Sequence, residues 1–216
     1  MVAVAANPRR TQEERSRATR LKIQEGAMRC LKRSGYSGAT MVRIAKEAGV
    51  TTGALQHHFA DRRDLMLSVV REGYERLVAD VAEQMPRMAQ PGSSGERVQP
   101  GSVRGRVDGA IDAMIAGYSA APAIAAYEVV LAMRDDEDFS RQHLGITAPY
   151  AAELDRQWLE LFADVPVREA SKRTARRVAR SCILGLLSSA STGLATVDQD
   201  TVRGLQQSVL HLLSPN

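Results

Sequence analysis

The chain has 216 residues, enough to bury a substantial core in one large domain or in a small domain joined to a larger one. Hydrophobic residues make up 44% of the chain and charged residues 25%, which argues against intrinsic disorder. Nowhere do 18 apolar residues run together, and the short apolar run at the N-terminus precedes its charges, the reverse of a secretory signal. We therefore expect a cytoplasmic protein without a membrane partner.

The net charge of +4 hides an uneven distribution along the chain. Residues 1–63 contain 13 Lys and Arg against 5 Asp and Glu, which leaves +8, whereas residues 64–216 contain 16 against 20, which leaves −4. A basic N-terminal third is expected when that end of a protein meets a polyanion. Taken alone, the same pattern also fits a solvated charged face.

Motifs of catalysis and metal binding are missing from the sequence. It contains no GxSxG, Walker loop, GxGxxG or HExxH pattern, and Cys30 and Cys182, too far apart for a CxxC pair, are expected to be reduced core thiols. The acidic run at residues 135–138 is similar to the aspartate-rich magnesium motif of all-α prenyl synthases, but Phe139 stands where that motif needs a carboxylate. We interpret the run as a loop with helix-capping acids and expect no enzymatic activity, cofactor or metal.

The hydrophobic pattern predicts an all-α fold. Aromatic residues make up only 4% of the chain, and most segments repeat apolar residues at intervals of three and four. About nine helices are expected, and the first four lie near residues 11–35, 40–48, 51–59 and 61–85. The other five are predicted over residues 103–119, 122–134, 140–163, 167–195 and 199–213.

Local signals mark several of the predicted helix ends. Thr11 is followed by Glu14 at the spacing of a capping box, and Gly35 is placed to end the first helix. Asp61 is a suitable N-cap for the fourth helix, which Pro86 should end.

The C-terminal part has signals of the same kind. Asp138 or Ser140 is expected to cap the seventh helix, and Asp198 or Asp200 the last helix. The Gly-, Pro- and Ser-rich segment QPGSSGERVQPGS makes residues 90–102 the clearest linker. We expect a smaller domain with a basic arm at 1–63 and a larger helical domain at 64–216.

The stretch VTTGALQHHF, residues 50–59, has the features of a recognition helix. It follows a short helix and Gly49, and the apolar residues of both helices are spaced to pack together as in a helix-turn-helix, whose second helix enters the major groove. Gly53 lacks a Cβ and allows close approach to DNA, while Thr51 and Thr52 place hydroxyls near N–H groups that attract phosphate. Capping of the helix is an alternative role for the two threonines.

His57 and His58 raise the alternative of a metal site. Neighbouring residues on a helix point about 100° apart, and no further ligand has a suitable spacing, so zinc is disfavoured. Contact with DNA and a structural role remain open for both histidines.

The segment from Ile23 to Leu65 resembles the DNA-binding domain of TetR-type (tetracycline-repressor-like) transcriptional regulators. The resemblance lies in an amphipathic helix that ends in Gly35-Tyr36, followed by TMVRIAKEAGV, TTGALQHHF and DRRDL. The rest of the chain is similar to this family in length and helical content. The resemblance implies an N-terminal three-helix helix-turn-helix domain followed by a larger helical ligand-binding and dimerisation domain.

The resemblance also implies particular DNA contacts. The family has a phosphate-binding Lys where this chain has Arg62, and usually an aromatic residue where it has Gln56, which implies altered contact chemistry there. It further implies that His58 binds phosphate while His57 faces the groove. Arg43 is expected to contact the DNA backbone, and the alternative is that it lies on a solvated face. The expected DNA-binding residues are Thr40, Arg43, Thr51, Thr52, Gly53, Gln56, His57, His58, Arg62 and Arg63.

Two sets of residues are expected to act in the larger domain. The resemblance implies that the last two helices form a four-helix bundle with the same helices of a second copy. The alternative is that these helices pack only within their own chain. The expected interface residues are Ile183, Leu184, Leu187, Ala190, Leu205, Val209 and Leu212.

Large or polar-tipped residues on the central helices are expected to line a ligand cavity, and the alternative is that they belong to the core. These are Met114, Tyr118, Tyr127, Met133, Trp158 and Phe162.

Together these features predict a homodimeric, sequence-specific transcriptional regulator. We expect a repressor that leaves a pseudo-palindromic double-stranded DNA operator when a small apolar or amphipathic effector binds. An effector-independent or architectural DNA-binding protein, a protein that binds acidic partners and an all-α enzyme are the alternatives. The basic cluster at residues 168–180 is expected to be a salt-bridged face, with a second polyanion site as its alternative.

Overall fold

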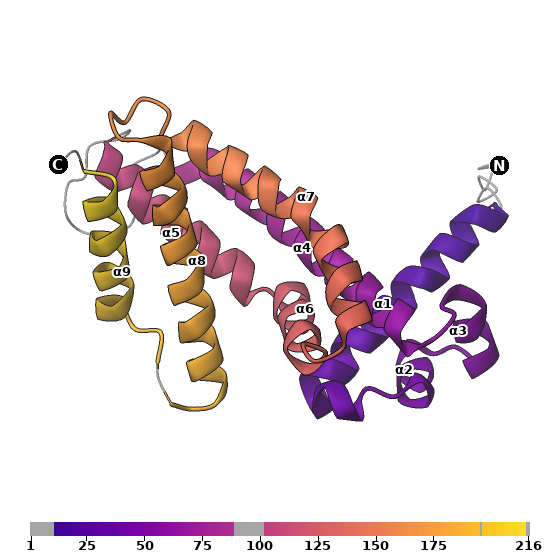
Figure 1. Cartoon of the computed structure of the whole chain (residues 1–216). Helices are drawn as coiled ribbons and strands as arrows, with labels where there is room; N and C mark the ends of the chain where they lie inside the picture. Colours follow the sequence, from indigo (N-terminus) through magenta and orange to yellow (C-terminus); the bar gives the residue numbers. More distant parts are fainter. Residues whose placement is uncertain (1–10, 89–101, 195, 215–216) are drawn as a thin grey trace, which may run out of the picture.

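The computed structural model describes residues 11–88, 102–194 and 196–214. Within these ranges the chain forms nine α-helices and no strand, which confirms the all-α prediction (Figure 1). The predicted linker at residues 90–102 lies almost wholly outside the described residues. The helices are α1 (Gln12–Gly38), α2 (Met41–Ala48), α3 (Thr52–His58), α4 (Arg62–Met88), α5 (Val103–Ser119), α6 (Ala121–Ala132), α7 (Glu137–Leu161), α8 (Glu169–Ser191) and α9 (Gln199–Leu212).

Side-chain caps begin several of these helices where the sequence indicates. The Thr11 hydroxyl accepts a hydrogen bond from Glu14 N at 3.2 Å, and Glu14 Oε2 accepts one from Thr11 N at 2.8 Å, which completes the predicted capping box. Asp61 accepts from Asp64 N at 2.8 Å at the start of α4, and Asp198 accepts from Thr201 N at 2.8 Å at the start of α9.

Gly35 interrupts α1 at the predicted position. Its left-handed φ of +63°, which glycine adopts without a Cβ clash, breaks the helical backbone, and a short second helical part continues to Gly38. Two other predicted helix ends were wrong. Pro86 lies inside α4 rather than at its end. The N-cap of α7 is Asp136, whose carboxylate accepts from Phe139 N at 2.9 Å, and not Asp138 or Ser140.

The helices form an elongated molecule with α1, α2 and α3 at one end and α5, α8 and α9 at the other (Figure 1). The long helices α4 and α7 run side by side between the two ends (Figure 1). α6 packs against both α1 and α4. The N-terminal helices are therefore attached to the rest of the molecule through α4 and α6.

One apolar core holds the N-terminal end together. It joins residues of α1, α2, α3 and the first turns of α4, and it continues without a break into α6 and the start of α7. The predicted division at residue 63 consequently does not coincide with a gap in packing. α6 contributes Ala125, Ala126 and Val129, α7 contributes Phe139, and Met133 contributes from the segment between them.

A second core occupies the C-terminal end, where α5, α7, α8 and α9 meet. Its centre contains Ile111, Phe162, Ile183 and Val209, each at most 1% exposed. Among the described residues, no single helix combines the length and apolarity of a membrane span. Only α5 and α6 taken together reach these values, across a bend of 69°.

The close approach of α4 and α6 at a glycine predicts a sensitive position. A Cβ added to Gly73 of α4 would lie 2.5 Å from the Ala126 Cβ and 2.6 Å from the Pro122 carbonyl oxygen of α6. Gly73→Ala should therefore lower the free energy of unfolding by about 1–3 kcal/mol through overpacking. Gly145→Ala, in a helix and with nothing within 4 Å of the added Cβ, is the control and should be neutral or stabilising by up to about 1 kcal/mol. Urea denaturation measures both, and equal effects would contradict the prediction.

Candidate nucleic-acid interface

The turn between α2 and α3 gives the helix pair its geometry. Gly49 adopts the left-handed conformation, with φ +67° and ψ +35°, and its N–H donates to carbonyl groups of the last turn of α2. Ile44 of α2, Leu55 of α3 and Phe59 directly after α3 are each 0% exposed and belong to the same core. The buried apolar faces and the glycine turn make α2 and α3 a helix-turn-helix.

The opposite face of α3 is open to solvent. Thr52, Gly53, Gln56 and His57 are all exposed, and their spacing places them on one side of the helix. A Cβ at Gly53 would meet nothing within 4 Å, so packing inside the chain does not require glycine there. A face of this kind is free to approach an external partner.

Thr40 and Thr51 both cap helices, the alternative role considered for Thr51. The Thr40 hydroxyl accepts from Arg43 N at 3.3 Å, and the Thr51 hydroxyl accepts from Ala54 N at 3.0 Å. A hydroxyl that accepts one hydrogen bond retains its own proton for donation. Capping is therefore compatible with a phosphate contact, and both threonines are exposed, as is Arg43.

The two histidines have different environments. His57 is exposed, whereas His58 is half-buried and its ring meets that of His57 edge-on with centroids 5.4 Å apart. Burial, with smaller effects from His57 and Arg20, lowers the pKa of His58 below its ordinary value. His58 is therefore a neutral hydrogen-bonding group at neutral pH and not a cation.

Arg20 has a structural role that the sequence did not indicate. Its Nη1 donates to the His58 carbonyl oxygen at 2.9 Å, and its guanidinium lies 4.2 Å from the centre of the Phe59 ring. Arg20 thereby ties α1 to the C-terminal end of α3, where a cation also complements the helix dipole.

The structure gives Arg62 and Arg63 partners inside the chain, in contrast to the expected DNA contacts. The Arg62 guanidinium stacks on the Tyr36 ring at 4.0 Å and donates to the Tyr36 carbonyl oxygen. Arg63 is paired with Asp136 at 2.6 Å and with Asp138 at 3.7 Å. Both arginines therefore hold α4 to neighbouring segments, and this explains why two cations open a helix at the end unfavourable for them.

A cluster of charges fixes α2 on α1. Glu47 of α2 accepts hydrogen bonds from Arg33 and, at 3.1 Å, from Arg29, both on α1. The hydrogen bond from Arg33, together with that from Arg29, holds the pKa of Glu47 below its usual range. The helix-turn-helix is thus clamped to α1 by charge as well as by the apolar core.

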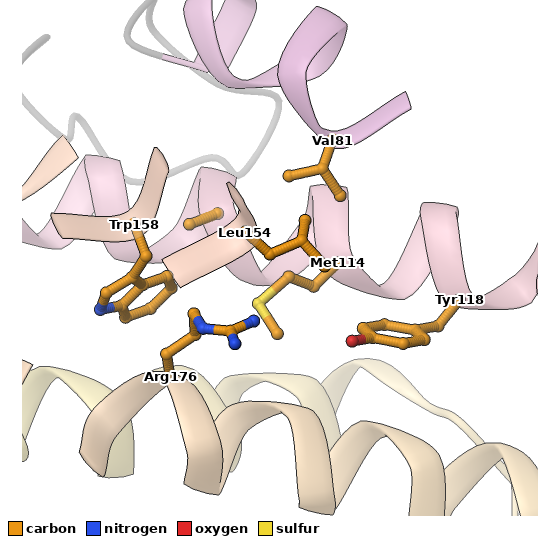
Figure 2. A pocket seen from close by; sticks show the side chains of 7 residues that line it. Val81, Met114, Tyr118, Leu154, Trp158 and Arg176 are labelled. Carbon is orange, nitrogen blue, oxygen red and sulfur yellow. The ribbon is translucent and has the colours of Figure 1, made fainter. Parts of the chain in front are cut away.

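Three of the six residues expected at a ligand cavity do lie around one. Met114, Tyr118 and Trp158 line a space between α4, α5, α7 and α8, together with Val81, Ala110, Leu154 and Arg176 (Figure 2). The space is narrow, about 20 Å³ open to the centre of a water molecule, which suffices for roughly one water.

The other three candidates lie outside this cavity. Phe162 is fully buried, with its ring 4.7 Å from that of Trp158, and Met133 belongs to the N-terminal core. Tyr127 is half-buried on α6. Met133 and Phe162 are therefore core residues, which is the alternative considered for them in the sequence.

The residues expected at a dimer interface fall into two groups. Ile183, Leu205 and Val209 are buried in the C-terminal core of their own chain, which corresponds to the alternative of an intrachain seam. The remaining four keep accessible surface on α8 and α9: Leu184, Leu187, Ala190 and Leu212.

Comparison with known proteins gives matches at the N-terminal end. Residues 23–69 match the family model for bacterial regulatory proteins of the tetR family. Over 64 residues the chain is 44% identical to the transcriptional repressor AcnR of Corynebacterium diphtheriae, an alignment that covers 30% of this chain and 34% of that protein. Over 69 residues it is 36% identical to the transcriptional regulator CymR of Pseudomonas putida, covering 32% and 34%. The chain thus aligns with about a third of the length of these relatives.

Solved structures match over nearly the whole chain. A protein of unknown function from Rhodococcus sp. RHA1 has a TM-score of 0.67 at 19% identity, covering 97% of this chain and 100% of that one. The multidrug binding protein EbrR, complexed with imidazole, has a TM-score of 0.61 at 20% identity, covering 91% and 96%. The fold is therefore that of helix-turn-helix proteins with a large helical C-terminal part. Residues 23–69 therefore form a helix-turn-helix segment of the kind found in bacterial regulatory proteins of the tetR family, and the chain as a whole shares the fold of these solved structures.

The charge clamp on α2 predicts a pH-dependent contribution to stability. Because the folded state lowers the pKa of Glu47, its contribution is present above the unfolded value of 4.5 and is lost as the pH falls through the folded pKa. Glu47→Gln should therefore destabilise the protein at pH 7, and the difference from the unmodified protein should shrink below about pH 4.5. Denaturation at several pH values measures this.

Glu25→Gln is the matched control for this prediction. Its carboxylate is exposed and lies 4.0 Å from Arg29, so its removal should change stability little at any pH. If Glu47→Gln lowers stability by the same amount at every pH, the ionised Glu47 carboxylate does not stabilise the fold through Arg29 and Arg33.

Proposed function

We propose that the protein is a sequence-specific DNA-binding transcriptional regulator, a cytoplasmic repressor that a small molecule releases from its operator. The observation that carries this proposal is the exposed polar face of α3, held on a helix whose opposite face is fully buried. A rigid helix with a solvent-exposed polar face suits insertion into the major groove. The names of AcnR and CymR, a repressor and a regulator, support the same class of function.

Different residues are proposed for base and backbone contacts. Thr52, Gly53 and Gln56 lie where α3 would meet the base edges, and Gln56 can pair with adenine through both its amide groups. Phosphate contacts are proposed for the flanking residues that remain accessible, with neutral His58 as an N–H donor. These are Thr40, Arg43, Thr51, His57 and His58.

We propose that the functional unit is a homodimer. A single recognition helix contacts few base pairs, and two copies about one helical turn of DNA apart supply the required specificity. Gly185 of α8 and Gly204 of α9 are exposed, and an added Cβ at either would meet nothing within 4 Å of the same chain. Such positions allow the helices of a second copy to approach closely.

Release by a small molecule is proposed from the cavity and from one structural neighbour. The cavity lies between helices that link the two ends of the molecule, so occupation of it can favour one arrangement of α4 over another. EbrR has been solved with imidazole and with proflavin, and it shares the fold of this chain. An effector that binds the DNA-free arrangement more tightly would release the operator.

Selection of binding sites from random DNA tests the proposed function. The selected sites should share a pseudo-palindrome with half-sites about 10 base pairs apart. Gln56→Ala should cost about 1–3 kcal/mol on the selected site and relax the preference at one base pair per half-site. Equal affinity of the unmodified protein for selected and random duplexes would reject the proposal.

Two arginines form a matched pair for the backbone contacts in the same assay. Arg43→Ala should reduce the slope of log K against log salt by about 0.9 for each phosphate that the protein no longer neutralises. Arg62→Ala should leave this slope unchanged, because its guanidinium is bound to Tyr36. An altered slope for Arg62→Ala would place that residue at the DNA after all.

The proposed dimer predicts the effect of a charge on α8. Leu184 is half-buried and lies outside the intrachain core, so Leu184→Arg should leave the fold intact and disrupt the association of two copies. Light scattering should give twice the chain mass of 23.5 kDa for the unmodified protein and a single chain mass for this variant. Ala170→Arg, exposed at the start of α8, is the control and should remain dimeric. A monomeric unmodified protein would contradict the proposal.

A further inference from the structure

A single guanidinium enters the otherwise apolar cavity. Arg176 of α8 lies among the side chains of Trp158, Leu154 and Met114, and only 8% of its side chain is exposed (Figure 2). Removing a charge from water is costly unless hydrogen bonds and an opposite charge compensate. The partners of Arg176 therefore indicate what the cavity can accept.

The partners of Arg176 occupy one side of its guanidinium. Nε donates to Asp155 of α7, and Nη2 makes a long contact of 3.4 Å with the Ala151 carbonyl oxygen. Among the described residues Nη1 has no hydrogen-bond partner. Asp155 therefore fixes the orientation of the guanidinium through Nε while a terminal N–H group remains available to a ligand.

A second donor lies across the cavity from the first. The Tyr118 side chain points along the cavity with its hydroxyl toward Arg176 (Figure 2). Burial raises the pKa of Tyr118 to about 12, against the opposing charges of Arg176 and Arg180, so the phenol keeps its proton at neutral pH. No hydrogen bond from this hydroxyl is found within the described parts of the chain. Two donors thus face a space whose other walls are apolar.

The charges around this space leave an excess of positive potential. Asp155 is shared between Arg176 and Arg173, and Arg173 also pairs with Glu169 at 2.8 Å. Arg180, one turn further along α8 and close enough to affect the pKa of Tyr118, has no carboxylate within ion-pair distance among the described residues. An anion entering beside Tyr118 would therefore be attracted, and a cation repelled.

We infer that the effector of this regulator is an apolar carboxylic acid. Its carboxylate would accept hydrogen bonds from Arg176 and Tyr118, and its hydrocarbon part would lie against Val81, Met114 and Trp158. A carboxylate is planar, as the guanidinium is, and the two hydrogen-bond donors of Arg176 and Tyr118 can both donate to it. The inference rests on the proposed function, since it names the class of molecule that acts at the proposed effector site.

The size of the cavity sets a condition on entry. About 20 Å³ is too small for such a molecule, so side chains must move when it binds. Met114 is unbranched and has three rotatable side-chain bonds, which makes it the wall residue best able to make room.

Trp158 allows a direct test, because it is the only tryptophan in the chain and it lines the cavity. Its fluorescence should be followed while the full-length protein is titrated with decanoate and decylamine below their micelle-forming concentrations and with decanol below its solubility limit. These probes share one hydrocarbon chain and differ in the charge of the head group. Decanoate should bind about ten to a hundred times more tightly than decanol, and decylamine most weakly.

Variants separate the role of the guanidinium from its effect on folding. Arg176→Gln should remove the preference for decanoate over decanol, and the double variant Asp155→Asn, Arg176→Gln should do the same without a stranded carboxylate. Tyr118→Phe should weaken decanoate binding while decanol binding stays unchanged. Arg177→Gln removes the same charge from the exposed side of α8 and should retain the preference.

Several outcomes would overturn the inference. They are equal binding of the three probes, tighter binding of decylamine, no binding of decanoate, or an unchanged preference in the double variant. DNA binding of the control variant Arg177→Gln without any probe should match that of the unmodified protein. If the protein does not prefer decanoate but still binds DNA site-specifically, the inferred effector class is wrong while the proposed regulatory function stands. If the unmodified protein shows no site-specific DNA binding, the proposed function itself is rejected.

Discussion

Phe59 is the residue on which the position of the recognition helix depends. It follows α3 directly, is fully buried in the N-terminal core, and has the Arg20 guanidinium across its ring. The same guanidinium holds the last carbonyl group of α3, so one side chain of α1 fixes both the end of the helix and the aromatic ring that anchors it. With this end fixed and Thr51 capping the other, a seven-residue helix that would be unstable alone is held rigidly.

The N-terminal end of the molecule is coupled to the rest by apolar packing and by ions. α4 begins in the helix-turn-helix core and reaches the cavity at Val81. A displacement of this helix at the cavity would therefore also displace its residues in the helix-turn-helix core. Arg63 joins the first turn of α4 to Asp136 at the start of α7, and α7 in turn contributes Leu154 and Trp158 to the cavity walls. Two continuous helices thus connect the proposed effector site to the proposed DNA site.

Short-range signals in the sequence were sufficient to predict most helices. The caps at Thr11, Asp61 and Asp198 depend on residues within three positions, and all three form as expected. Long-range partners could not be predicted in this way. Arg62 finds its partner 26 residues away and Arg63 finds Asp136 73 residues away, so two basic residues that looked available for phosphate are engaged within the chain. In the same way an apolar stripe on α8 cannot reveal whether Ile183 faces its own core or a second copy, because both environments select the same residue types.

The narrowness of the cavity has a kinetic consequence. A molecule larger than a water cannot enter the packed arrangement, and side chains of the cavity wall such as Met114 must first move to open it. The observed rate of effector association should then level off at high concentration, at the rate of this opening motion. A regulator built in this way responds to a lasting rise in its effector and ignores brief fluctuations that end before the opening occurs.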